Sequence, residues 1–472
     1  MVGLALCVTA FGIVTMGIAI WASRRVHTVE DFVVAGRNLS LVMTTGSLIA
    51  TWFGAGALLV AADEIALEGL PAAIFEPIGS ALCLLLAAVF FARRLWNEKL
   101  LTINEIFSKK YNQRAAVLAA IFDFGFITWV ATQFLALAGI FHVFFGIPIT
   151  AGVIIVAIFL VAYTMIGGMW SVAVTDVAQL VCLSIGMLFL TWTMLAETGE
   201  GSLLGGVNAI LASNTPDRLT LIPTSSAPEF LGWLGLLAAA SLGNISGQDL
   251  MQRIFSAKSA DVAVRASYLS AIAYLTMGIA PILFGLGAGL IIGENAHEAV
   301  IADIAQRLLS PAAVIIFTLM VMATVMSSVD SGLLAPASIL ATNVLPQSIR
   351  DRIPALILTR ICVAVCGILS VVMALSGLSG FELLEGSYSA GLTPFVIITF
   401  GVYRKKDPAS AAVWTLAFGL VLWLGEMLLA VLIPSFDLDA MLPLPSSLFT
   451  LVVSVIIYFA ICRIVRARAS KN

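Results

Sequence analysis

Hydroxyl and carboxylate side chains gather in the stretch ATVMSSVDSGLL, which continues the apolar run 311–322. Ser327, Ser328 and Ser331 lie within just over one helical turn, and Asp330 stands between them. Their oxygen atoms are hard donors of the kind that a cation such as Na⁺ requires, and unwound backbone carbonyls can supply further ligands. Back-bonding of a hydroxyl to its own helix would explain one serine, but not three with an aspartate. The stretch therefore predicts a cation site.

A second acid inside an apolar region is Asp176, in the stretch SVAVTDVAQL. Ser171, Thr175 and Gln179 accompany it and add further polar atoms. A carboxylate in this position either neutralises a bound cation or is a helix N-terminal acid favoured by the helix dipole. The residues alone leave both interpretations open.

Glycine interrupts two of the apolar segments that must position these side chains. The segment 41–61 contains TTGSLIATWFGAG, and the segment 229–247 ends in LGNISG. Paired glycine-interrupted helices at corresponding positions of two halves point to inverted repeats with a substrate site near the bilayer midplane. Ordinary helix packing through small residues is the alternative. We expect a first repeat over 41–195 and a second over 229–402, each with a broken first helix.

Composition sets the class of protein. Of 472 residues, 61% are hydrophobic and only 11% are charged, against about 25% charged in soluble proteins. The chain is therefore predicted to be an all-α polytopic membrane protein that forms one transport domain, 1–472. Thirteen membrane spans are predicted, at 2–22, 41–61, 71–92, 115–145, 149–166, 172–195, 229–247, 266–292, 311–335, 355–376, 385–402, 409–433 and 447–465. The first is an extra N-terminal helix, and the last two, over 409–465, follow the repeats.

The charges order these spans across the membrane. With thirteen spans, all 24 Lys and Arg residues except Arg218 and Arg307 fall on one side. Since positive charge is retained in the cytoplasm, we expect the N-terminus outside and the C-terminus in the cytoplasm, in the plasma (inner) membrane. The cysteines lie in apolar runs without a CxxC pair, and the three histidines are far apart, so neither a disulfide framework nor a zinc site is predicted. Basic patches interleaved with aromatic residues, which would suggest nucleic acid, do not occur.

Three motifs carry a resemblance to a known family. They are IGGMWSVAVTDVAQ (166–179), DFVVAGR (31–37) and MSSVDS (326–331). In these motifs the chain resembles the sodium/solute symporter family, and within it most nearly the high-affinity choline transporter branch. The resemblance implies a LeuT-like fold with five-plus-five inverted repeats, and uptake driven by sodium.

The resemblance also implies ligands for the coupling ion. For Na⁺ these are backbone carbonyls of Ala50, Phe53 and Thr324 and the hydroxyls of Ser327 and Ser328. Some members bind a second ion, and here that site would consist of Asp176, Asp330 and Ser331. Whether the second site exists in this chain stays open.

A choline-type substrate site is an aromatic cage, because a quaternary ammonium is held by ring quadrupoles. The residues that the resemblance places in this site are Trp52, Trp129, Phe381, Gly247 and Gln248. Gly247 stands where the family has a cage tryptophan. This departure suggests a larger and more polar pocket, for a choline-like or other amine, an amino acid or an organic acid.

The sequence therefore predicts a secondary transporter, not an enzyme, that couples Na⁺ entry to uptake of a small polar solute. Na⁺ is the coupling ion, and no other cofactor is expected. The predicted partners are the solute, Na⁺ and the lipid bilayer, without nucleic acid or an obligate protein partner. One rival is a proton-coupled carrier of the same fold that uses Asp176 or Asp330 as its proton site. A rival of a different class is a membrane sensor.

Overall fold

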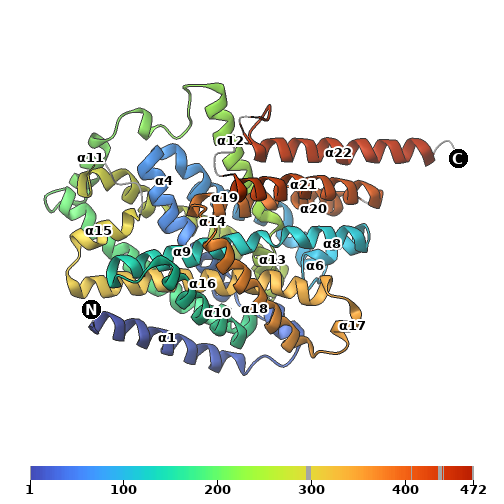
Figure 1. Ribbon diagram of the computed structural model, residues 1–472, viewed down its shortest axis with the longest axis horizontal. Coiled ribbons are helices and arrows are strands. Elements are labelled where there is room, and N and C mark those ends of the chain that lie inside the picture. The colour runs from blue at the N-terminus through green and yellow to red at the C-terminus, as the bar shows by residue number, and fades with distance from the viewer. Residues whose placement is uncertain (1, 294–298, 405–406, 434–437, 440, 470–472) are drawn as a thin grey trace.

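Figure 1 shows the computed structural model, which describes residues 2–293, 299–404, 407–433, 438–439 and 441–469. Helices make up almost all of the regular structure in these ranges. Within them, β-structure is limited to one isolated parallel bridge between Leu39 and Ala257. The all-α fold class predicted from the sequence is confirmed.

The helices follow one another along the whole chain. Those of the first half are α1 (Val2–Ser23), α2 (Val29–Val34), α3 (Leu41–Trp52), α4 (Ala61–Glu68), α5 (Ser80–Leu86), α6 (Ala92–Asn97), α7 (Asn104–Lys110), α8 (Gln113–Phe122), α9 (Gly125–Phe145), α10 (Ile149–Thr198) and α11 (Leu203–Ser213). Those of the second half are α12 (Ala227–Leu242), α13 (Gln248–Ser256), α14 (Ala260–Ile291), α15 (Val300–Leu308), α16 (Pro311–Ile339), α17 (Gln347–Arg350), α18 (Ala355–Ala374), α19 (Gly380–Ala390), α20 (Leu392–Tyr403), α21 (Ala409–Leu432) and α22 (Ser446–Ala469). Short 3₁₀ or π segments continue or join them: η1 (Ala35–Arg37), η2 (Gly56–Val60), η3 (Leu70–Ile74), η4 (Phe75–Gly79), η5 (Ala87–Phe91), η6 (Asp217–Leu219), η7 (Gly243–Ser246) and η8 (Leu340–Val344).

Two spans are broken where glycine interrupts them. Among the described residues, ten helices are long and apolar enough to cross a membrane, and two bent helix pairs would each add one span. The first pair, Leu41–Trp52 with Gly56–Glu68, bends by 57°, and the second, Ala227–Ser246 with Gln248–Ser256, bends by 48°. These are the two helices that the sequence predicts to be broken.

The helix α10 accounts for two of the predicted spans. Its 50 residues reach roughly 75 Å at 1.5 Å per residue, more than twice the ~30 Å hydrocarbon core. Its backbone breaks at Gly168, where φ is 57° and ψ is −172°, a conformation that glycine adopts readily. A Cβ at Gly168 would lie 2.5 Å from a ring carbon of Phe32. Counted as the spans 149–166 and 172–195, α10 brings the twelve spans to the predicted thirteen.

The helix α16 forms the centre of the core. Its residues 320–339 are all buried, and it packs against α3, α9, α10 and α18. By contrast, α1 and α22 lie along opposite edges of the bundle in Figure 1, and only 22% of the apolar window of each is buried inside the protein. The remaining apolar surface of these edge helices is available to lipid.

The linker that leads into the first broken helix is joined to the linker that leaves the second. Leu39 donates its amide proton to Ser256 O at 3.0 Å, and Lys258 donates to Leu39 O at 3.0 Å. Before this bridge, Thr28 and Asp31 form a capping box at the start of α2. Burial alone would raise the pKa of Asp31, but hydrogen bonds from the Thr28 side chain and from the amides of His27 and Thr28 lower it. The motif DFVVAGR therefore serves to anchor this linker.

Candidate functional site

The break after α3 lies against the serine stretch of α16. Carbonyl groups at the end of a helix have no partner within it, and here α16 supplies hydroxyls. Ser327 Oγ donates to the Ala50 carbonyl at 2.7 Å and to the Thr324 carbonyl at 3.0 Å, and Ser328 Oγ donates to Thr51 O at 2.8 Å. Each of these five residues is at most 1% exposed. Carbonyl and hydroxyl oxygens thus converge in a space closed to solvent.

This donor set suits a hard cation. A hydroxyl carries two acceptor lone pairs in addition to its proton, so Ser327 and Ser328 can turn their oxygens toward an ion. Phe53, another predicted ligand, is buried at the C-terminal end of α3, where its dihedral angles leave the helical range. Its ring packs edge-on against Tyr274, with centroids 5.2 Å apart. The structure therefore places all five predicted Na⁺ ligands around the break after α3: Ala50, Phe53, Thr324, Ser327 and Ser328.

The residues predicted for a second ion meet one helical turn further along α16. Ser331 Oγ donates to Asp330 Oδ1 at 3.0 Å and lies 3.1 Å from Thr51 Oγ1. Ser47 Oγ donates to Asp176 Oδ2 at 2.5 Å. Asp176 Oδ1 and Asp330 Oδ2 are buried without a hydrogen-bond partner in the described part of the chain. These two free carboxylate oxygens have the capacity to bind a cation or a proton.

A buried guanidinium enters the same cluster. Arg253, on α13, is 0% exposed; one nitrogen lies 3.6 Å from Asp176 Oδ2, and the same nitrogen donates to Ser331 Oγ. The sequence analysis placed Arg253 in a cytoplasmic loop because it follows the predicted end of a span at 247, and this placement is wrong. With both carboxylates ionised, one guanidinium leaves the cluster one positive charge short. Burying the negative charge that remains uncompensated is costly, so the cluster favours binding of one additional cation or proton.

A small cavity lies on the other side of the first break. It is lined by Trp52, Phe126, Trp129, Asn244, Asp249, Ser387 and Tyr388. We call it the central cavity. The structure thus brings together the two tryptophans predicted for the substrate cage, one from α3 and one from α9, and adds aromatic rings from Phe126 and Tyr388.

Asp249 is the charged group of this cavity, and the sequence analysis missed it. It is 5% exposed, and its Oδ2 accepts a hydrogen bond from Trp52 Nε1 at 2.8 Å. Its Oδ1 lies 2.6 Å from the point where a Cβ on Gly247 would stand. The carboxylate therefore occupies space that any side chain at position 247 would need. An acid two residues after a glycine break inside an apolar region was the available signal.

Of the five predicted substrate residues, Gly247, Gln248 and Phe381 are not in the lining of the central cavity. Gln248 is fully buried and accepts a hydrogen bond from the Ile103 amide at 2.7 Å, so it ties α13 to the loop before α7. Phe381 packs against Phe75, with ring centroids 5.3 Å apart. It lines a separate outer cavity together with Glu64 and Glu76.

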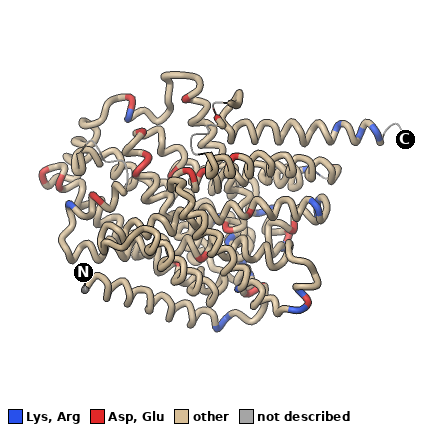
Figure 2. Tube along the Cα trace, in the orientation of Figure 1, with Lys and Arg blue, Asp and Glu red and all other residues tan. Residues whose placement is uncertain are grey.

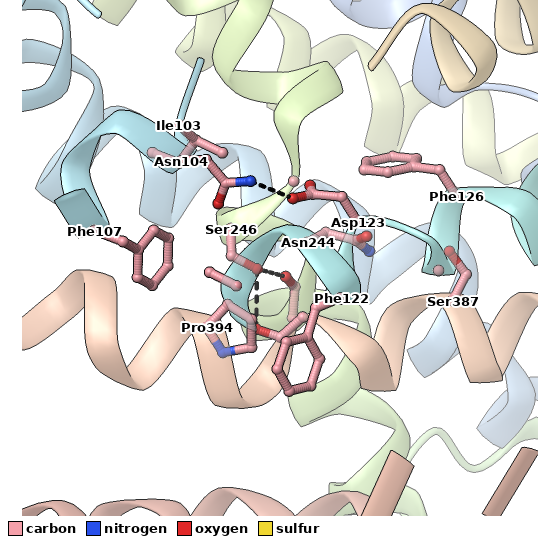
Figure 3. Close-up of a pocket in the computed structure, with 15 residues that line it drawn as sticks. Ile103, Asn104, Phe107, Phe122, Asp123, Phe126, Asn244, Ser246, Ser387 and Pro394 are labelled. Atoms are coloured by element: carbon pink, nitrogen blue, oxygen red, sulfur yellow. Dashed lines mark hydrogen bonds between the residues drawn. The ribbon is translucent and has the colours of Figure 1, made fainter. Parts of the chain in front are cut away.

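An inner cavity continues from the central one (Figure 3). Phe126, Asn244 and Ser387 line both cavities. The charged group of the inner cavity is Asp123, which is 8% exposed and accepts a hydrogen bond from Asn104 Nδ2 at 3.1 Å. Gly247 faces this inner cavity.

Each of the three cavities has an acidic group in its lining, and a hydrogen bond joins the linings of the outer and central cavities. Glu76 of the outer cavity accepts hydrogen bonds from the hydroxyls of Ser80, Tyr274 and Tyr388, and Tyr388 lines the central cavity. In the described ranges, none of the residues that line these three cavities is Lys, Arg or His. Acidic linings of this kind favour positively charged solutes and disfavour anions.

Comparison with known proteins settles the family. A profile described as "Sodium:solute symporter family" matches residues 32–419. The chain belongs to the sodium:solute symporter family. Its relatives include the high affinity choline transporter 1 of Homo sapiens, 30% identical over 368 residues, which are 74% of this chain and 63% of the human protein. The Caenorhabditis elegans high-affinity choline transporter 1 is 27% identical over 466 residues, 90% of this chain and 78% of that protein.

Solved structures agree with this membership of the sodium:solute symporter family. A Na⁺-coupled sialic acid symporter in a substrate-bound, outward-open state aligns over 98% of each chain with a TM-score of 0.78, at 16% identity. Mhp1, a nucleobase-cation-symport-1 family transporter, aligns with a TM-score of 0.58 over 93% of this chain and 95% of its own, also at 16% identity. At these identities the likeness establishes the fold, which is the LeuT-like arrangement predicted.

Proposed function

We propose that this chain carries out Na⁺-coupled uptake of a small cationic amine. The observation that supports it best is the Asp249 carboxylate, buried in a cavity with Trp52 and Trp129. A buried carboxylate is stabilised by a cation beside it, and the faces of the tryptophan rings attract the same cation. An organic acid would instead meet acidic groups with no basic side chain to offset them. Relatives named as choline transporters are consistent with a cationic solute.

The proposed sodium site consists of Ala50, Phe53, Thr324, Ser327 and Ser328. The proposed sodium site adjoins the proposed solute site, because Ala50 of the first and Trp52 of the second are two residues apart at the same break. An ion that holds the Ala50 carbonyl fixes the end of α3 and therefore the position of the Trp52 ring. Binding of the ion and of the solute would in this way stabilise each other.

Proton coupling is the second candidate, and the cluster of Asp176, Asp330, Ser331 and Arg253 favours it. The cluster lacks one positive charge, and either a proton or a second Na⁺ would supply it. The resident guanidinium already occupies part of the volume that a second Na⁺ would need. Coupling to one Na⁺ with a proton bound at the acids is therefore the alternative to coupling to two Na⁺ ions.

The distribution of charge supports the orientation needed for uptake. Figure 2 shows Lys and Arg mostly toward the end of the bundle where the chain terminates, and Asp and Glu mostly toward the opposite end. The N-terminus of α1 lies toward the acidic end (Figure 1). By the positive-inside rule the basic end is cytoplasmic. We accordingly assign the N-terminus to the outside and the C-terminus to the cytoplasm. The two repeats that we propose to move relative to each other during transport are 41–195 and 229–402.

The test is uptake by the purified protein in liposomes. Radiolabelled ethanolamine and choline are supplied with an inward gradient of Na⁺, of K⁺, or of protons without Na⁺. We expect accumulation with Na⁺ and not with K⁺. Accumulation driven by protons alone would replace Na⁺ with H⁺ as the coupling ion. Uptake of a carboxylate solute in preference to both amines would overturn the cationic proposal, and absence of transport for any solute would favour a sensor.

A further inference from the structure

We infer that the central cavity selects ammonium ions that carry at least one N–H, with Asp249 as the acceptor, over quaternary ammonium ions. This inference rests on the proposed function, since it presupposes a cationic solute in that cavity. It concerns a residue pair, Asp249 and Gly247, rather than the aromatic rings.

The Asp249 carboxylate is held in a fixed position. The indole N–H of Trp52 occupies Oδ2 at 2.8 Å. One turn along α13, Arg253 Nη1 donates to the Asp249 main-chain carbonyl at 2.8 Å, which fixes the backbone that carries the carboxylate. Gly247 leaves the space for Oδ1, which comes within 2.6 Å of the ideal Cβ position there. An acceptor held in this way loses little conformational freedom when a donor binds to it.

The Asp249 carboxylate is not paired in a salt bridge. In the described residues, no such contact joins it to a Lys, Arg or His side chain. The Arg253 guanidinium, one turn along α13, attracts this charge, but its side-chain contacts are with Ser47, Asp176 and Ser331. A charge this deeply buried needs a counter-charge. The cationic solute is the group that can supply it.

A carboxylate and an aromatic ring differ in what they require of a cation. The rings of Trp52, Trp129 and Phe126 attract any ammonium, because the attraction is to charge. A carboxylate oxygen additionally accepts a hydrogen bond, and hydrogen bonds between ionised groups are about twice as strong as neutral ones. A quaternary ammonium presents only methyl groups and cannot donate. It would also leave a buried acceptor unpaired, which discriminates strongly between otherwise similar ligands.

The experiment uses the series ethanolamine, N-methylethanolamine, N,N-dimethylethanolamine and choline. All four are cations at neutral pH, and each step adds one methyl group, but only the last step removes the final N–H. The four compounds compete for Na⁺-driven uptake of radiolabelled ethanolamine in liposomes. For the unmodified protein we expect the first three to compete within a few-fold of one another. Choline should compete about tenfold or more weakly, which corresponds to about 1.4 kcal/mol.

Two variants assign the last step to Asp249. In Asp249→Asn the charge is removed, and the step from N,N-dimethylethanolamine to choline should shrink to less than about threefold. Trp52→Phe keeps a ring but removes the donor that holds Oδ2, so it should reduce the same step. The series measured on the unmodified protein is informative even if Asp249→Asn fails to fold.

The outcomes separate this inference from the function on which it rests. If choline competes as well as N,N-dimethylethanolamine in the unmodified protein, the selectivity inference is overturned while cation uptake stands. An unchanged last step in Asp249→Asn overturns it as well. If none of the four cations is taken up with Na⁺, the proposed function itself fails.

Discussion

Replacement of one sodium-site serine should weaken Na⁺ binding far more than replacement of another buried serine of the same helix. Ser327→Ala removes a hydroxyl that joins the Ala50 and Thr324 carbonyls at 2.7 and 3.0 Å. Ser338→Ala removes an equally buried hydroxyl that bonds only within α16, to Ala335 O at 2.7 Å. The pair therefore differs in the partner of the hydroxyl, while helix, burial and the atoms removed are the same.

The size of the effect follows from the partner. A hydrogen bond or ligand contact to a charged group is worth about 1.5–3 kcal/mol, and 1.4 kcal/mol is tenfold in affinity. Loss of Ser327 Oγ should therefore raise the Na⁺ concentration for half-maximal uptake by roughly tenfold to a hundredfold or more. Ser338→Ala should leave that concentration within about twofold of the unmodified protein.

Two assays read this difference. Uptake in liposomes as a function of external Na⁺ gives the half-maximal concentration. Thermal unfolding of the purified variants in rising Na⁺ gives binding without transport, because a ligand of the folded state stabilises it by RT ln(1 + [L]/Kd). The Na⁺-dependent rise in unfolding temperature should be lost in Ser327→Ala at concentrations that still stabilise Ser338→Ala. Equal Na⁺ dependence in the two variants would refute the assignment of the site.

Three further predictions follow from other parts of the core. Asp176→Asn leaves one carboxylate and one guanidinium in the acidic cluster, which is then neutral without a further cation. The number of ions carried per solute, measured from reversal potentials, should therefore fall by one, or transport should stop. Unchanged stoichiometry and rate would make Asp176 a structural partner only. Gly247→Ala places a Cβ 2.6 Å from Asp249 Oδ1, so the carboxylate must move, and competition by choline should improve relative to N,N-dimethylethanolamine; an unaltered ratio would contradict the packing argument. Gly168→Ala forces a residue with a side chain into a left-handed backbone conformation, which costs of order 1–3 kcal/mol. The purified variant should therefore unfold at a lower temperature than the unmodified protein. Gly139→Ala is the control, because open space surrounds that position, and it should not lower the unfolding temperature.

The sequence predicted the large features of the site because they depend on patterns that a helix repeats. Glycine interruptions located both bent pairs, and the serines at one-turn spacing were placed on the buried face of α16 opposite the first break. Trp52 and Trp129 were brought into one cavity. In each case the side chain lies on or next to a regular helix, whose 3.6-residue period sets its direction.

What the sequence did not predict lies at the second break, where that period does not apply. Gly247 has extended dihedral angles, φ −64° and ψ 131°, so the directions of Gln248 and Asp249 could not be inferred from helical periodicity. Gln248 turns toward Ile103, and Asp249 turns into the central cavity. Arg253 was misplaced for a different reason: a count of charges assigns an arginine near a span end to the loop. Its partners Ser47, Asp176 and Ser331 come from three other helices.

The bridge between Leu39 and Ala257 offers a way to follow the transport cycle by amide hydrogen exchange. Because the bridge consists of main-chain atoms, nearly any side chain would preserve it, and a donor would be lost only through proline at Leu39 or Lys258. It ties the start of the first broken helix to the end of the second. If these two segments separate during transport, the amide protons of Leu39 and Lys258 will exchange with deuterated water mainly in the state in which the segments are apart. Their exchange rate would then report how much of that state is populated, in the absence of any labelled solute.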